Sequence, residues 1–431
     1  MPRVDSPSLD PLAEPTARVT PGFIAVLALT NLGIWTAFFT PIQFLLPLQV
    51  EAIDPVGKEA SLGVVVAVGA LVSLVASPIA GAFSDRTSSR LGRRRSWVLW
   101  PTVAAVAVLV LMGGRTTIGG LVLGWALGQL TLNASYAAVI AMLPDQVPVA
   151  QRGTVGAVVG AAQPLGVIVG SLIATMVPGD NTAPTGQNAR YVVVAVVVAL
   201  TAVLFVTRMR DPQLPRDRIP ALHAGPFLRG FWIDPRQHPD FAWVFLTRFL
   251  VILGTAFVTT YLLYFTRDVL GRSPEEAGDT VAAILQFYIV ALLVFALIAG
   301  PVSDRVGRVK PFVIGASLLC AAAIVVLAFA RTQGMATLAA ALMGAGFGAY
   351  TAVDLALISR VLPSAGDRAR DLGIINIANA LPQVLAPLIA SVWITVLKST
   401  SYEVAYQSLY LFAAVVTVLG AVLVVKIRSV P

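Results

Sequence analysis

The sequence predicts an all-α integral membrane protein whose twelve transmembrane helices form two six-helix bundles. Three observations support this fold class. The 431 residues are 57% hydrophobic and 12% charged, whereas an ordinary soluble chain carries about a quarter charged residues. Twelve apolar stretches come close to or exceed the roughly 20 residues that a helix needs to cross a bilayer. A short charged motif also occurs twice, about half a chain apart, which indicates a duplicated unit.

The repeated motif joins two long apolar segments in each half of the chain. The first copy reads GAFSDRTSSRLGRRR and starts at Gly81, and the second reads GPVSDRVGRVK and starts at Gly300. Asp85 and Asp304 occupy the same place in the two copies and lie 219 positions apart. The two halves are therefore expected to share one helical plan.

The apolar runs define the expected spans and the segments between them. The prediction comprises a polar tail at 1–20, an N-terminal bundle at 21–208, a cytoplasmic linker at 209–240, a C-terminal bundle at 241–426 and a tail at 427–431. The spans of the first bundle are expected at 21–46, 60–83, 97–113, 117–143, 153–177 and 191–208, and those of the second at 241–265, 277–300, 311–330, 334–361, 372–397 and 403–426. The linker holds six prolines and both histidines, as is typical of an irregular connection.

The distribution of basic residues predicts which way the chain faces. If both termini are cytoplasmic, 23 of the 30 Lys and Arg residues lie on the cytoplasmic side, among them seven Arg from 208 to 248. The positive-inside rule therefore predicts a multi-pass protein of the cell membrane with both termini in the cytoplasm. This topology explains the net charge of +8 without nucleic-acid binding. The outer side keeps scattered bases: Lys58, Arg115, Arg190, Arg267, Arg272, Arg331 and Lys398.

Cysteine and histidine are too scarce for several kinds of chemistry. Cys320 is the single cysteine, and His223 and His238 both lie in the linker. No Ser-His-Asp set, metal-ligand spacing or phosphate-binding Gly-Lys-Ser/Thr loop is present. The sequence therefore predicts no enzyme, no metal site, no cofactor and no ATP-driven transport. The expected partners are the lipid bilayer and a small-molecule substrate, and a monomer would contain the complete path.

The charged loop and its repeat resemble the signature loop of the major facilitator superfamily, and the resemblance covers the whole chain. The run from Ser84 to Arg95 is similar to the version in the glycoside–pentoside–hexuronide cation symporters and sucrose transporters. The resemblance implies secondary transport by alternating access. It also implies that this loop latches the two halves together on the cytoplasmic side; the alternative is a basic loop that only sets topology. The motif residues are Gly81, Asp85, Arg86, Gly92, Arg93, Arg94, Gly300, Asp304, Arg305, Gly307 and Arg308.

Neutral polar residues at helical spacing are the candidate substrate contacts. Residues three or four apart share one helix face, and amides, phenols and an indole suit an uncharged, polyhydroxylated ligand. The same residue types also hold membrane helices together, which is the alternative for each of them. The candidates are Asn31, Trp35, Gln43, Gln129, Asn133, Tyr136, Gln163, Tyr261, Tyr264, Gln286, Asn376, Asn379 and Gln383.

Asp354 is the acid that the sequence places well inside a span. A carboxylate there is costly and typical of an ion or proton path, so Asp354 is the candidate proton carrier, with Tyr350 one turn away as a hydrogen-bond partner. The alternative is a structural acid paired with Arg360 or another base. Acids that form the cation site on the second and fourth helices of the sodium-coupled glycoside symporters have no counterpart here, which argues against a sodium site.

Sugar or glycoside transport, with a proton as the candidate co-transported ion, is the function that these residues favour. One alternative is proton-coupled efflux of drug-like or metabolic compounds, and another is an uncoupled facilitator. Gly156, Gly160, Pro164 and Gly166 loosely resemble the antiporter motif of the superfamily, although its adjoining Gly-Pro pair is missing. A receptor or scaffold on a transporter fold is a third alternative.

Overall fold

The computed structural model describes residues 15–428, except 216, 218, 220–235, 307 and 362–367. Side chains are described for these residues apart from those at 149, 301, 304, 355, 356, 358–361 and 368–376. Most of the predicted linker, including His223, lies outside the described residues. Within the described part every regular element is helical, and twelve spans are long and apolar enough to cross a membrane. The predicted fold class is confirmed.

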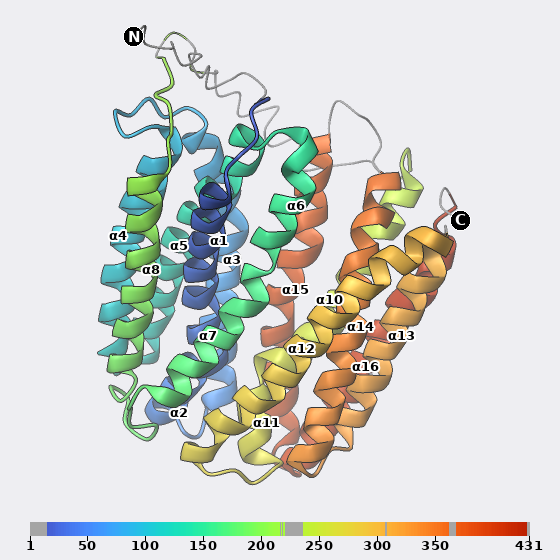
Figure 1. Cartoon of the computed structure of the whole chain (residues 1–431). Helices are drawn as coiled ribbons and strands as arrows, with labels where there is room; N and C mark the ends of the chain where they lie inside the picture. Colours follow the sequence, from blue (N-terminus) through green and yellow to red (C-terminus); the bar gives the residue numbers. More distant parts are fainter. Residues whose placement is uncertain are drawn as a thin grey trace, which may run out of the picture.

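Figure 1 shows the helices in their order along the chain. The first half contains α1 (Pro21–Thr40), the π-helix η1 (Pro41–Leu45), α2 (Leu46–Ile53), α3 (Lys58–Ser84), α4 (Arg93–Gly113), α5 (Ile118–Gln146), α6 (Val149–Gly160), α7 (Ala162–Met176) and α8 (Asn188–Arg208). The second half contains α10 (Pro239–Thr260), α11 (Leu262–Asp268), α12 (Pro274–Val306), α13 (Lys310–Ala328), α14 (Gln333–Val361), α15 (Arg368–Leu397), α16 (Tyr402–Leu423) and the short 3₁₀ turn η3 (Val424–Lys426).

Several spans differ in extent from the expected ones for physical reasons. The first is three helical pieces that continue to Ile53, with the π-helix starting at Pro41, where the ring cannot donate the usual backbone hydrogen bond. The fifth is broken at Ala161, directly after Gly160. The third begins at Arg93 rather than 97, because the first arginines of this helix are buried in ion pairs and need not stay outside the span.

The helices of each half pack mainly on one another, and a few contacts join the halves. In the first half α5 lies against α3 and α4, and α1 lies against α7 and α8; in the second half α14 lies against α12 and α13. Contacts of α3 with α15 and of α7 with α12 join the two bundles. In Figure 1 the ribbons of the two bundles meet at the end away from the chain termini and diverge toward the end that carries them.

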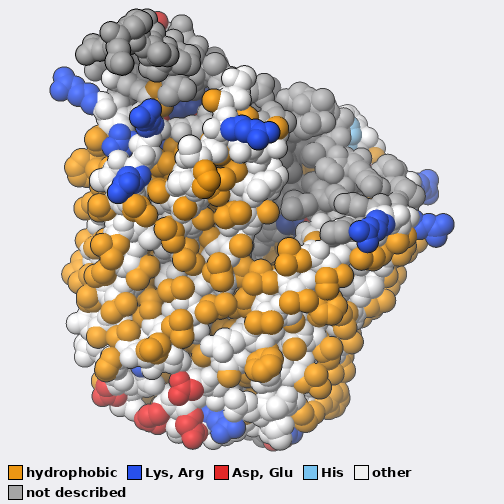
Figure 2. Space-filling model, in the orientation of Figure 1, with side chains coloured by type: hydrophobic (Ala, Val, Ile, Leu, Met, Phe, Trp, Pro, Cys, Tyr) orange, Lys and Arg blue, Asp and Glu red, His pale blue; other side chains and the backbone are white. Residues whose placement is uncertain are grey.

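We call the end with both termini the termini face and the opposite end the distal face. Lys and Arg side chains gather at the termini face, acidic side chains show at the distal face, and hydrophobic side chains cover the surface between them (Figure 2). This gradient is what the positive-inside rule expects of a chain whose termini are cytoplasmic. The orientation itself stays a prediction.

Candidate functional site

An aromatic cluster lies where α1 approaches α5. The Trp35 ring lies edge-on to Tyr136 at 5.2 Å and stacks on Phe39 at 5.4 Å between centroids. Ala28, Leu32, Trp35 and Phe39 share one face of α1, and all four are only partly buried. The other faces of α1 are covered by helices of its own bundle. The structure therefore brings the predicted residues Trp35 and Tyr136 together, on a face of α1 that its neighbouring helices cover only in part.

The amides predicted on α5 bond to each other. Asn133 Nδ2 donates to Gln129 Oε1 at 2.8 Å and to the Gln129 carbonyl at 2.8 Å, and both residues are at most 9% exposed. On α1, Asn31 Nδ2 donates to the Leu27 carbonyl at 2.8 Å. Among the described residues no donor reaches Asn31 Oδ1 or Gln43 Oε1, and both atoms are buried. Several of the amide groups predicted to bind a sugar therefore already form hydrogen bonds within their own helices.

The second half holds a buried charge pair. Asp354 of α14 is 2% exposed and forms an ion pair with Arg248 Nη1 of α10. Arg248 Nε also donates to Asn379 Oδ1 of α15 at 2.7 Å. The predicted residues Asp354 and Asn379 thus meet at Arg248, a base grouped above with the cytoplasmic arginines. The signal was present, because Arg248 lies inside the predicted seventh span and a base there needs a buried acid.

Tyr350 lies one helical turn before Asp354 and is 2% exposed. Its ring stacks on Phe347 with 6.0 Å between centroids, and its hydroxyl has no described hydrogen bond to Asp354. In this conformation Tyr350 packs against Phe347, and its role as a hydrogen-bond partner of Asp354 stays a prediction. Arg360, the alternative partner proposed for Asp354, has a side chain outside the described residues.

Three predicted glutamines are exposed. Gln383 lies one turn before Pro387, whose carbonyl contacts the other bundle, so Gln383 is on the helix face that looks toward that bundle. Gln163 shares a face of α7 with the buried residue Val167. Gln286 of α12 is exposed as well. The side chain of Asn376 lies outside the described residues.

The two tyrosines predicted to contact substrate belong instead to the closure of the distal face. The Tyr261 hydroxyl lies 3.0 Å from the carbonyl oxygen of Glu59 and 3.0 Å from that of Pro387. The Tyr264 hydroxyl donates to the Pro47 carbonyl at 2.9 Å. Both side chains are fully buried. Because these hydroxyls bond to the backbone of the opposite bundle, we no longer count the two tyrosines among the candidate substrate contacts.

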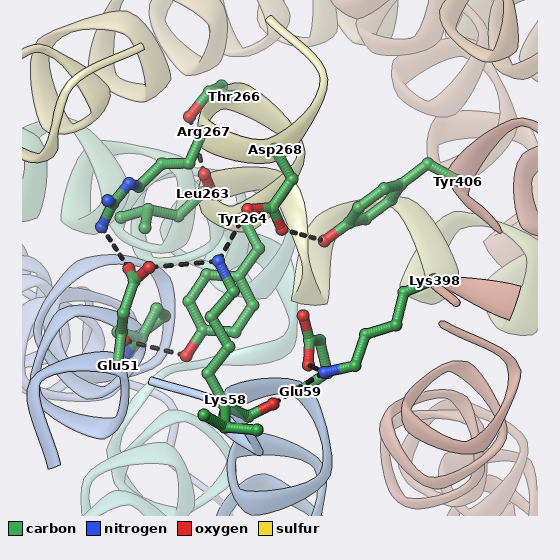
Figure 3. Close-up of polar contacts among 12 residues, drawn as sticks. Glu51, Lys58, Glu59, Leu263, Tyr264, Thr266, Arg267, Asp268, Lys398 and Tyr406 are labelled. Carbon is green, nitrogen blue, oxygen red and sulfur yellow. Dashed lines mark hydrogen bonds and ion pairs between the residues drawn. The ribbon is translucent and has the colours of Figure 1, made fainter. Parts of the chain in front are cut away.

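Six charged residues surround these tyrosines at the distal face and form what we call the distal network (Figure 3). Lys58 Nζ lies 2.7 Å from Asp268 of the other bundle and 3.1 Å from Glu51 of its own. Lys398 Nζ lies 2.7 Å from Glu59. Arg267 pairs with Glu51. The members are Glu51, Lys58 and Glu59 of the first half and Arg267, Asp268 and Lys398 of the second.

Burial makes these charges interact strongly. The side chain of Glu59 is fully buried, those of Lys58 and Asp268 are 6% and 9% exposed, and the other three are between 15% and 20% exposed. Burial raises the pKa of the Asp268 carboxyl, and the ammonium of Lys58 opposes this rise. In the sequence these bases look like scattered charges. No local pattern reveals the network, because its six residues come from four separate segments: α2, the start of α3, α11 and the turn after α15.

The predicted cytoplasmic gate motif is centred on Arg94. Its guanidinium contacts Asp85 at 2.6 Å, Asp145 at 2.7 Å and Ser84 at 2.9 Å. Arg93 adds a 2.9 Å contact to Asp145. The described contacts of Asp85 and Arg94 thus lie within the first half, and in this conformation they do not latch the halves together. Their geometry joins α3, α4 and α5.

The first residues of the linker are attached to the same motif. Asp211 Oδ2 accepts hydrogen bonds from the backbone N–H of Arg94 at 2.5 Å and of Arg95 at 2.8 Å. This places a carboxylate at the N-terminus of α4, where the helix dipole favours it. Burial raises the pKa of Asp211, and the two N–H donors oppose that effect. Arg86, the remaining base of the motif, donates to the Ala82 carbonyl at 2.6 Å.

The second copy of the motif is described only in part. Gly300 lies within α12, and Arg305 and Arg308 are exposed. Gly307 and the side chain of Asp304 lie outside the described residues. The symmetry that the sequence predicts between the two loops therefore stays a prediction for these side chains.

Comparison with known proteins gives the family. Residues 23–285 and 244–431 match the sequence pattern of the Major Facilitator Superfamily. The multidrug resistance protein MdtG of Enterobacter lignolyticus (strain SCF1) is 25% identical over 416 residues, covering 92% of this chain and 90% of its own. MdtG of Serratia proteamaculans (strain 568) is 26% identical over 325 residues, covering 73% of each.

Solved structures share the fold at low sequence identity. A bacterial homologue of the human lysosomal transporter Spinster, inward-facing and occupied, has a TM-score of 0.74 at 13% identity and covers 95% of this chain and 97% of its own. A mutant of the nucleoside transporter NupG has a TM-score of 0.73 at 13% identity, covering 94% and 98%. The match over almost the whole length, the twelve spans and the repeated loop agree: the chain belongs to the major facilitator superfamily.

Proposed function

We propose that this protein exports amphipathic, aromatic organic compounds in exchange for protons. Membership of the superfamily makes it a membrane transporter of small molecules and not an enzyme. The efflux alternative is better supported than sugar symport, because the relatives that cover most of the chain are named multidrug resistance proteins. If the termini are cytoplasmic, the ion pairs that close the distal face support an inward-facing conformation.

The observation that carries the proposal is the aromatic cluster on the open face of α1. Phe39 and Tyr136 present flat apolar surfaces beside Trp35, with ring centroids 5.4 Å and 5.2 Å from that of Trp35. Stacking on such rings contributes about 0.5–1.5 kcal/mol beyond the burial of area, and it tolerates many ligand shapes. A sugar would need several free amides close together, whereas Gln129 and Asn133 bond to each other and Asn379 accepts from Arg248. The exposed glutamines lie on three different helices: Gln163 on α7, Gln286 on α12 and Gln383 on α15.

Arg248 and Asp354 form the coupling device of this proposal. A proton on Asp354 would neutralise the carboxylate and remove the counter-ion of Arg248, which stays charged. A buried base without a counter-ion is costly in free energy. The protein with a protonated Asp354 therefore favours a different arrangement of α10 and α14 from the protein with an ionised Asp354. A proton can drive the transport cycle only through such a difference between states.

Transport assays in proteoliposomes test the substrate class and the coupling separately. Counterflow needs no driving force, so it is measured first with labelled mono- and disaccharides beside rhodamine 6G, an aromatic cation. Exchange of rhodamine without exchange of any sugar is the expected result. Exchange of a sugar alone would contradict the proposal and return the protein to the sugar class.

Substitution of the rings locates the site. Trp35→Ala is expected to weaken apparent rhodamine affinity about tenfold, since about 1.4 kcal/mol corresponds to a factor of ten. The matched control is Trp100→Ala, because Trp100 is 64% exposed on α4. Equal affinities for the two variants would show that the cluster does not bind the compound.

Substitution of the acid tests coupling. Asp354→Asn is expected to abolish uptake driven by a pH gradient while counterflow continues, because the amide carries no titrating proton. Retention of pH-driven uptake in this variant would exclude Asp354 as the proton carrier. An absence of pH-driven uptake by the unmodified protein would identify an uncoupled facilitator.

A further inference from the structure

We propose that Lys58 is the central charge of a releasable gate, in which three ion pairs hold the two bundles together at the distal face. The pairs are Glu51–Arg267, Lys58–Asp268 and Glu59–Lys398, and each joins one bundle to the other. This inference concerns conformation and does not depend on the substrate proposed above.

The two sides of the gate are complementary in charge order. The first bundle supplies Glu51, Lys58 and Glu59, a net charge of −1, and the second supplies Arg267, Asp268 and Lys398, a net charge of +1. The first bundle supplies the acid of the first and third pairs and the base of the middle pair, and the second bundle supplies the opposite charges. A shift in register would bring like charges together, so the arrangement favours one way of closing.

Lys58 has more contacts than any other base of this set in the described part of the chain. Its ammonium contacts Asp268 at 2.7 Å and Glu51 at 3.1 Å, and it lies 4.7 Å from the centre of the Tyr264 ring. Asp268 is held in turn by the Tyr406 hydroxyl at 3.3 Å. Figure 3 shows the Lys58 side chain between Glu51 and Asp268. Loss of this one charge leaves three carboxylates with two bases.

The location of the gate explains why it can be released. Its charges lie at the distal end of the spans, where separation of the bundles returns them to water instead of lipid. Closure removes that water, and the mutual attraction offsets the lost hydration only while every charge keeps a partner. Removal of Lys58, the base that Glu51 and Asp268 share, should therefore open the gate, whereas exchange of the whole Lys58–Asp268 pair should leave it closed.

A buried reporter at the bundle boundary can detect opening. Ser391 of α15 is 6% exposed, and its side chain lies against Gly63 of α3. Cys320 is the single cysteine and is fully buried, so Ser391→Cys in a Cys320→Ala background gives one reactive position. We would measure its rate of reaction with a charged maleimide in lipid nanodiscs, where both faces are accessible and orientation does not matter.

Lys58→Met keeps a long unbranched side chain and removes the charge. We expect it to raise the labelling rate of Ser391→Cys at least about tenfold, the equivalent of about 1.4 kcal/mol. The matched control is Arg331→Met, which removes a base at the same face whose 3.7 Å pair with Glu403 is exposed and lies within one bundle. That control should label at the parent rate.

Two further variants keep the result decisive if Lys58→Met is loosely folded. Lys58→Met with the native Cys320 should stay unlabelled, because opening of the gate does not expose that cysteine. The exchanged pair Lys58→Asp with Asp268→Lys should label as slowly as the parent. The proposal is overturned by parent-like labelling of Lys58→Met, by equally fast labelling of Cys320 in that variant, or by fast labelling of the exchanged pair while Cys320 stays protected.

Discussion

At Gly92, backbone conformation and a neighbouring carboxylate both exclude a side chain. Its φ is +99°, a region that residues with a β-carbon rarely adopt. A β-carbon there would also lie 2.4 Å from the carbonyl oxygen and from the carboxylate of Asp211. This glycine lets the charged loop turn into α4 while Asp211 caps the helix. Gly81, in the same motif, has no atom within 4 Å of the corresponding position.

We therefore expect Gly92→Ala to lower the free energy of unfolding by about 1–3 kcal/mol, the usual cost of a strained backbone, with displacement of Asp211 adding to it. Gly81→Ala is the matched control and should leave stability unchanged or slightly higher, because alanine favours helix. Thermal unfolding in detergent, followed by tryptophan fluorescence, measures both. A similar midpoint for the two variants would show that the turn is not under this constraint.

Between elements, the most extensive contact at the bundle boundary is that of α3 with α15. A β-carbon on Gly63 would lie 2.7 Å from the Ser391 Cβ and 3.0 Å from the Pro387 carbonyl oxygen. Both of those atoms belong to the opposite bundle. The two helices can therefore touch only because Gly63 has no side chain, and their contact closes the path beside the distal network.

Gly63→Val is expected to hold the distal face open, because its methyl groups have space only when α3 and α15 separate. The separation of the two bundles is measured by double electron–electron resonance in the Cys320→Ala background. Spin labels are attached at Thr116→Cys and Thr400→Cys, which are exposed loop residues of the two bundles. The mean distance should increase. Gly119→Val, where no atom lies within 4 Å of the added carbon, is the control, and an equal distance in both variants would contradict the expectation.

For the molecule as a whole, the distal network links the rocking of the bundles to pH. Burial raises the pKa of Asp268 above its ordinary value of 3.8 in the closed state. Lys58 lowers that pKa, whereas Glu59 and Glu51 raise it further. When the bundles separate, the carboxylate returns to water and its pKa falls. The closed state therefore binds the proton more tightly, so acid favours closure.

The sign of the pH effect follows from this raised pKa. The contribution of Asp268 protonation to closure is fully present below pH 3.8 and is lost as the pH rises through the raised pKa. Distances between the same two spin labels should thus increase with pH over this window and then level off. Asp268→Asn should abolish the change, because the amide does not titrate. A pH response that persists in this variant would assign the effect to another group.

The fold could be predicted from the sequence because the bilayer imposes simple requirements on a chain. Length, apolarity and the excess of bases on one side suffice to define spans and an expected orientation, and the repeated loop reveals the two halves. Even errors in extent were small: Arg93 starts its helix early because Asp145 neutralises it. The same local signals identified Trp35, Tyr136, Asp354 and Asn379 as candidates.

Only the tertiary structure decided which of those polar residues lie together and which already have hydrogen-bond partners. Asp354 and its base Arg248 lie 106 positions apart, and Lys58 and Asp268 lie 210 apart. No periodicity within one helix relates such residues. Tyr261 and Tyr264 look like site residues in sequence, yet their hydroxyls reach carbonyls of the other bundle. The membrane determines each helix separately, whereas the gate and the site depend on how two bundles approach each other.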